Sequence, residues 1–293
     1  MRFVVNSKVS HPRRSTMSQT LSAPHKNHRI PTLDGWRAIA IAMVLVAHFG
    51  PGTRAFDIGK QGVGIFFVLS GYLITTNLLR ERSKSGAINL KNFYLRRFFR
   101  LMPVAWTLLA ITLIFGATDG REIASCVFFY RNFLIHPRTL VTSHFWSLSI
   151  EEQFYLAWPC VLVLAPRRAR LFAILAASAL AVYRFSLPLS FLNAHFGWTQ
   201  FHADALLIGC AFALTPKIPR MPAVVFWISA IVVAVCTHFF PSFPPFGESV
   251  LIGWMIQTTA RGAIPAVQKA LNWRPVAQIG VMSYSLYVWQ TPF

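Results

Sequence analysis

The chain has 293 residues, of which 55% are hydrophobic and only 13% are charged, about half the charged fraction of an ordinary soluble domain. Its net charge of +19 would by itself indicate nucleic-acid binding, but long uncharged runs leave little surface for a phosphate-binding face. The apolar content also excludes intrinsic disorder. Four cysteines without paired spacing exclude a disulfide-stapled domain, so a polytopic helical membrane protein remains.

Uncharged, mostly apolar runs recur along the whole chain. They occupy residues 38–53, 62–79, 101–118, 153–166, 171–183, 205–216, 221–247, 249–260 and 275–293. A membrane helix needs about 20 mostly apolar residues, so several runs reach this length only together with their polar flanks. We therefore predict an all-α, polytopic transmembrane bundle of about nine spans.

The distribution of Lys and Arg predicts a cytoplasmic N-terminus. If residues 123–146 do not cross the membrane, 22 of the 28 cations lie inside. If they crossed, the three arginines in residues 167–170 would move outside. The sequence therefore favours a non-crossing, extracytoplasmic or re-entrant segment at 123–146.

The first 30 residues are basic but lack the apolar core of a secretory signal peptide. We expect residues 1–30 to be a disordered cytoplasmic tail that anionic lipid attracts. Residues 31–293 are then one membrane domain, in a multi-pass protein of the cell (inner) membrane.

Ionisable residues within the first span are candidates for function, because their insertion into a membrane is costly. Arg37 and His48 are 11 residues apart, about 20° past three helical turns, so they share one face at an axial separation of roughly 16.5 Å. In the predicted orientation Arg37 lies at the cytoplasmic mouth and His48 lies toward the outer half. The simpler alternatives are that Arg37 extends to lipid headgroups, that Asp34 caps the helix, and that His48 is a hydrogen-bonded core residue.

The stretch WSLSIEEQFYLAWP at residues 146–159 contains two adjacent carboxylates. Glu151 and Glu152 project about 100° apart on a helix, so they cannot both face one ligand. One of them could face the interior while the other starts the helix, with Ser147 or Ser149 as its N-cap. The alternative is that both glutamates merely begin this helix.

A basic stretch, FYLRRFFRLMP, lies at residues 93–103. Arg97 and Arg100 share a helix face, and the guanidinium fork suits phosphate. Ordinary positive-inside contact with lipid is the alternative explanation. The His and Cys residues do not pair at ligand intervals, so no metal site is predicted.

Five stretches together resemble the acyltransferase 3 family of integral-membrane O-acyltransferases that modify carbohydrates. They are residues 30–48, 64–74 (GIFFVLSGYLI), 93–103, 146–159 and 283–289 (SYSLYVW). They follow the family order and cover nearly the whole chain, which makes the combination specific.

The resemblance implies transfer of an acyl group, usually acetyl, from a cytoplasmic acyl-CoA to a hydroxyl of an extracytoplasmic carbohydrate or glycoconjugate. The partners it implies are the lipid bilayer, acyl-CoA as donor substrate and the carbohydrate acceptor, with no permanently bound cofactor, no metal and no nucleic acid. It assigns the family's arginine–histidine pair to Arg37 and His48, and the principal acid to Glu151.

Further residues are expected to support these three. They are Asp34, Glu152, Ser149 and Asp204, with Arg97 and Arg100 as the donor's phosphate ligands. We hypothesise that the donor's phosphates bind at the cytoplasmic mouth and that its pantetheine arm reaches toward His48. There His48 acts as general base on the acceptor hydroxyl or accepts the acyl group itself.

The sequence departs from the family pattern at three places. Gln290 stands where many relatives have His, and residues 201–204 (FHAD) lack the Arg that is common near this Asp. The chain stops at Phe293, where relatives continue, so we expect a final span to be missing. A transporter or flippase, and an inactive relative that binds partner proteins, remain as alternative functions.

Overall fold

The computed structural model describes residues 30–50, 53–134, 139–239 and 246–290, and these residues form helices and connections without a strand. The tail at 1–29 and the last three residues lie outside the described part. The helices are α1 (Pro31–Phe49), α2 (Thr53–Ser85), α3 (Leu90–Ile114), α4 (Gly120–Val127), η1 (Arg131–Phe133), α5 (Phe145–Leu164), α6 (Ala169–Phe185), α7 (Leu189–Ala194), η2 (Thr199–Phe201), α8 (Ala203–Ala213), α9 (Ala223–Phe239), α10 (Phe246–Ala260), α11 (Pro265–Leu271) and α12 (Arg274–Val288).

The prediction of an all-helical membrane protein is confirmed. Within the described residues, every apolar run of the sequence overlaps one of the longer helices, and α4, α7 and α11 lie between the runs. Three helices, α1, α2 from Ile58 onward and α3, are long and apolar enough to cross a membrane. The count of nine spans and the direction of the chain remain predictions.

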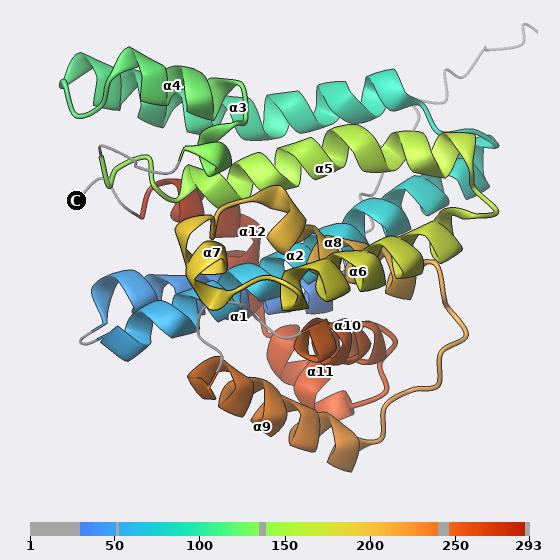
Figure 1. Cartoon of the computed structure of the whole chain (residues 1–293). Coiled ribbons are helices and arrows are strands. Elements are labelled where there is room, and N and C mark those ends of the chain that lie inside the picture. The colour runs from blue at the N-terminus through green and yellow to red at the C-terminus, as the bar shows by residue number, and fades with distance from the viewer. Residues whose placement is uncertain (1–29, 51–52, 135–138, 240–245, 291–293) are drawn as a thin grey trace, which may run out of the picture.

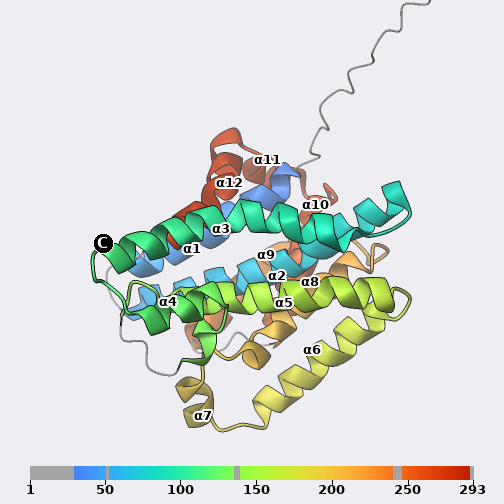
Figure 2. The same cartoon turned by 90° about the horizontal axis from the view of Figure 1, so that it is seen from above.

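The helices pack as a bundle around α1 and α2. Figure 1 shows α3 and α5 side by side along one face of this bundle, with α9, α10 and α11 on the opposite face. Figure 2 shows α6 and α7 on one side and α11 and α12 on the other. Helix α1 packs against both α2 and α12, and α2 also packs against α8.

Glycines allow α2 and α8 to pack at backbone contact. A Cβ atom on Gly71 would collide with the carbonyl oxygen of Leu206, and one on Gly209 would collide with that of Val68. Small residues at helix interfaces bring backbones together where apolar burial between helices gives little driving force in lipid. This contact fixes α2, which carries one wall of the site described below.

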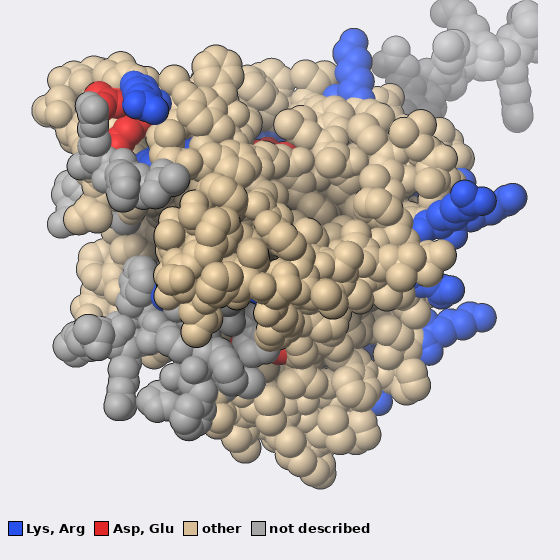
Figure 3. All heavy atoms as spheres, viewed as in Figure 1, with Lys and Arg blue, Asp and Glu red and all other residues tan. Residues whose placement is uncertain are grey.

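The outer surface of the bundle separates an apolar wall from a basic end. Figure 3 shows Lys and Arg projecting where the α2–α3 and α5–α6 connections lie, and a largely uncharged wall beside them. Large apolar side chains on the outer faces of α3, α6 and α9 are exposed, among them Phe99, Leu175 and Ile231. An apolar surface of this extent is typical of contact with lipid, and its basic end is the one that the charge distribution assigns to the cytoplasm.

The described residues between 123 and 144 form only short helices. Helix α4 has eight residues and rises about 12 Å, far less than the roughly 30 Å of a bilayer core. Buried Glu122 holds this segment together, because it accepts hydrogen bonds from Thr118 and Thr139 at 3.0 and 2.5 Å and lies 3.9 Å from buried Arg131. These elements are too short to cross a bilayer as helices.

Candidate active site

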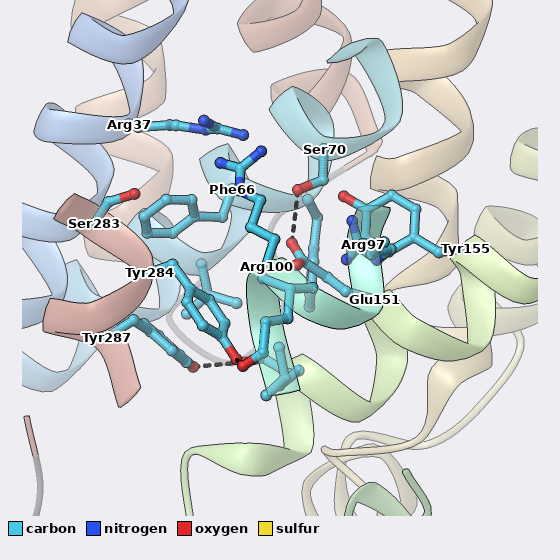
Figure 4. Close-up of a pocket in the computed structure, with 15 residues that line it drawn as sticks. Arg37, Phe66, Ser70, Arg97, Arg100, Glu151, Tyr155, Ser283, Tyr284 and Tyr287 are labelled. Carbon is cyan, nitrogen blue, oxygen red and sulfur yellow. Dashed lines mark hydrogen bonds between the residues drawn. The ribbon is translucent and has the colours of Figure 1, made fainter. Parts of the chain in front are cut away.

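A pocket of about 730 Å³, including the open space at its mouth, lies between α1, α2, α3, α5 and α12. Figure 4 shows the side chains that line it. The lining consists of Arg37, Val63, Phe66, Phe67, Ser70, Arg97, Arg100, Leu101, Ser147, Leu148, Glu151, Tyr155, Ser283, Tyr284 and Tyr287.

Two arginines from different helices converge on one side of the pocket. Figure 4 shows the guanidinium groups of Arg37, on α1, and Arg100, on α3, pointing toward each other. Asp34 lies one turn before Arg37 and accepts from it at 3.5 Å, which is too long for a strong bond. Two converging cations favour an anionic ligand between them.

Glu151 points into the pocket from α5. Its Oε1 accepts a hydrogen bond of 2.7 Å from the Ser70 hydroxyl on α2, and Figure 4 shows the Tyr155 hydroxyl directed toward the same serine. A carboxyl held in a pocket by one hydroxyl is able to exchange a proton with a bound substrate.

Glu152 turns away from the pocket, as the expected 100° between neighbours on a helix requires. Its two carboxylate oxygens each accept from Arg97 Nε at 3.1 Å, and Oε1 also accepts from Nη2 at 2.5 Å. The Arg97 guanidinium lies 3.3 Å from the ring centroid of Tyr155. Glu152 therefore joins α5 to α3.

The expectation that a serine caps this helix is wrong. Helix α5 begins at Phe145 and its N-cap residue is His144, whose side chain makes no capping bond. Ser147 and Ser149 thus lie within the helix. Both glutamates lie nearly two turns after its first residue, Phe145. Ser149 is buried, its hydroxyl has no hydrogen-bond partner among the described residues, and it is not part of the pocket lining.

Hydroxyl groups form the wall of the pocket opposite the two arginines. The Tyr287 hydroxyl, on α12, shares a short hydrogen bond with Ser147 and donates to the His144 carbonyl at 3.2 Å. Tyr284 donates to the Leu101 carbonyl at 2.8 Å. Helix α12 reaches this position because Gly280 packs on the carbonyl oxygen of Asp34.

The structure brings Arg37 and Glu151 to one pocket but does not place His48 in its lining. His48 lies exposed near the end of α1, and its Nδ1 is 2.8 Å from the Val44 carbonyl oxygen. It is within electrostatic range of His144, whose ring packs against that of Tyr287. Tyr287 lines the pocket, whereas His144 and His48 do not.

Asp204 lies away from the pocket and joins two helices. Its carboxylate is 2.9 Å from Arg184 on α6, which also donates to the Phe201 carbonyl at 2.7 Å. Both side chains are buried. The arginine missing from the sequence beside this aspartate is thus supplied from α6.

The sequence reasoning missed the hydroxyl groups of the pocket. Ser70, Tyr284 and Tyr287 lie within the stretches at 64–74 and 283–289, yet uncharged side chains did not stand out among apolar neighbours. Tyr155 follows Glu151 by one turn, which was the available signal. The described residues contain no group of His, Cys, Asp or Glu able to hold a metal ion.

Comparison with known proteins gives relatives over most of the chain. It is 29% identical to peptidoglycan O-acetyltransferase OatA of Listeria monocytogenes over 90% of this chain and 49% of that protein. It is 30% identical to the Bacillus subtilis protein YrhL over 91% of this chain and 49% of that protein. The chain therefore spans about half the length of these curated relatives.

No solved structure matches the chain. The family model of the acyltransferase domain called Acyl_transf_3 matches residues 30–293, a range that includes every helix of the pocket. The chain therefore belongs to the acyltransferase 3 family.

Proposed function

We propose that this protein is a membrane O-acyltransferase that moves an acetyl group from cytoplasmic acetyl-CoA to a hydroxyl of an extracytoplasmic carbohydrate. The observation that carries the proposal is that one pocket of the helical bundle brings together two converging arginines on one side and a carboxyl group with several hydroxyls on the other. The family assignment supports the type of reaction, and the O-acetyltransferase relative supports an acetyl group and a glycan acceptor.

The donor's phosphates bind Arg37 and Arg100 in this proposal. Both guanidinium groups face the pocket. Helices α1 and α3 begin at the basic side of the bundle, and Arg37 and Arg100 lie in the first half of these helices. A planar guanidinium matches phosphate geometry. The acyl group then points along the pocket toward Glu151.

In the reaction, the acceptor hydroxyl oxygen attacks the thioester carbonyl carbon, a C–O bond forms and the C–S bond breaks. The hydroxyl proton passes to a general base and then to the departing CoA thiolate, so no further reactant is required. Glu151 binds and orients the acceptor hydroxyl. His48 keeps its proposed role as base, supported by its electrostatic interaction with His144, whose ring packs against that of Tyr287 in the pocket lining.

Two pairs of variants test these roles in membranes supplied with radiolabelled acetyl-CoA and a soluble peptidoglycan fragment. Glu151→Gln is compared with Glu81→Gln, because Glu81 is a half-buried carboxylate that pairs with Arg96 outside the pocket. His48→Ala is compared with His195→Ala, because the Nδ1 of His195 makes the same contact with the carbonyl four residues earlier.

The proposal predicts that Glu151→Gln and His48→Ala each lower acetyl transfer about a hundredfold or more, the range of general acid–base effects, while both controls retain it. Full activity of Glu151→Gln would overturn the role of the pocket. Flux of the glycan across vesicles without acetylation would instead indicate a transporter.

A further inference from the structure

We propose that Arg97 is a positioning residue that fixes the carboxyl of Glu151 in the pocket, and that Arg37 and Arg100 alone contact the donor's phosphates. This inference rests on the proposed function. It assigns different roles to Arg97 and Arg100, which share a helix face and which the sequence predicts to bind the donor's phosphates together.

The guanidinium of Arg97 is already bound to the protein on its edge and on its face. Its Nε and Nη2 both donate to Glu152, and one face of the group covers the Tyr155 ring at 3.3 Å. A bidentate pair of this kind is strong and directional, and a guanidinium stacked on an aromatic ring gains further attraction. A phosphate would have to compete with both contacts.

Arg37 and Arg100 have a different setting. Figure 4 shows their guanidinium groups side by side on one side of the pocket, while that of Arg97 lies beside Tyr155. The side-chain contact that holds Arg37 is the 3.5 Å approach to Asp34. Two guanidinium groups that face the same pocket offer a phosphate charged donors from two helices at once.

The pair of Arg97 and Glu152 also determines where Glu151 points. Glu152 is only 7% exposed, so its bond to α3 holds α5 in one rotation about its axis. Glu151, the next residue, is turned by about 100° and thereby faces Ser70 across the pocket. A rotation or shift of α5 by about 1 Å would misplace this carboxyl, and errors of that size cost about a hundredfold in rate.

The variants Arg97→Gln, Glu152→Gln, their double variant and Arg100→Gln test the proposal in detergent-purified full-length protein. Binding of acetyl-CoA is measured by equilibrium dialysis, and kcat and KM for acetyl-CoA are measured with a peptidoglycan fragment as acceptor. Arg96→Gln is the matched control, because Arg96 is the preceding residue and pairs with Glu81 at the surface.

We expect Arg97→Gln and Glu152→Gln each to lower kcat about a hundredfold while the Kd for acetyl-CoA changes less than about twofold. The double variant should be more active than either single variant, because each single change leaves one buried charge without its partner. Arg97→Lys should recover part of the kcat, since it keeps the charge but not the fork. Arg100→Gln should instead weaken acetyl-CoA binding at least about tenfold, and Arg96→Gln should behave as wild type.

A donor-binding role for Arg97 gives the opposite pattern. Arg97→Gln would then weaken acetyl-CoA binding as much as Arg100→Gln, Glu152→Gln would leave binding and kcat unchanged, and the double variant would show no recovery. Failure of the proposed function is distinct, because wild-type protein would then neither bind acetyl-CoA nor transfer acetyl. In that case a thermal-unfolding cycle still tests the ion pair, and additive effects of the two single changes would refute it.

Discussion

The hydrogen bond between Ser70 and Glu151 gives a direct test of how the pocket works. Ser70→Ala removes the hydroxyl that donates to Oε1 at 2.7 Å and leaves the backbone of α2 unchanged. A hydrogen bond to a charged group contributes about 1.5–3 kcal/mol. If the bond holds the carboxyl in its reactive position, its loss lowers kcat by about one to two orders of magnitude, at about 1.4 kcal/mol per factor of ten.

The assay is acetyl transfer from labelled acetyl-CoA to a peptidoglycan fragment, with the amount of folded protein measured by size-exclusion chromatography. Ser83→Ala serves as control, because Ser83 lies on the same helix and its exposed hydroxyl donates to the nearby Arg80 carbonyl, outside the pocket. A Ser70→Ala variant with kcat within twofold of wild type would show that the orientation of Glu151 does not depend on Ser70. An equal loss in Ser83→Ala would show that the effect is a general one on α2.

Three further predictions concern the donor, the fold and the helix packing. Arg37→Gln should raise the KM for acetyl-CoA about tenfold with little change in kcat, because one charged contact to phosphate is lost; a change in kcat alone would contradict this. Arg184→Met should lower the stability to unfolding by about 3–5 kcal/mol, since it leaves the Asp204 carboxylate buried without its cation; thermal unfolding in detergent measures this, and an unchanged midpoint would refute a stabilising pair. Gly71→Val should prevent folding because its side chain would meet the α8 backbone, whereas Gly120→Ala, with no atom near its Cβ, should fold and elute as wild type does.

The sequence was sufficient to predict the longer helices, because uninterrupted apolar runs have few alternatives in a membrane. The sequence also predicted that Glu151 and Glu152 project in different directions, since the angle between neighbours on a helix is fixed. It could not predict that Arg97 would be the partner of Glu152. That choice depends on how α3 lies against α5, which no local pattern encodes.

Arg37 and His48 show the limit of an argument from helical periodicity. Two residues on the same face of an ideal helix can still contact different neighbouring helices at different positions along the helix axis. Arg37 is half-buried and lines the pocket together with residues of α2, α3 and α12, whereas Val46, His48 and Phe49 are all exposed at the end of α1. Periodicity therefore places residues on a face, but the neighbouring helices decide whether the residues reach the same pocket.

The sidedness of acetyl transfer tests the central claim most directly. Purified protein in vesicles is sorted by orientation, labelled acetyl-CoA is supplied at the face that carries the basic residues, and a peptidoglycan fragment is enclosed on the other side. The account predicts label on the enclosed glycan with wild-type protein and at least about a hundredfold less with Glu151→Gln. Label that appears only when donor and glycan share one side, or that is unaffected by Glu151→Gln, would contradict it.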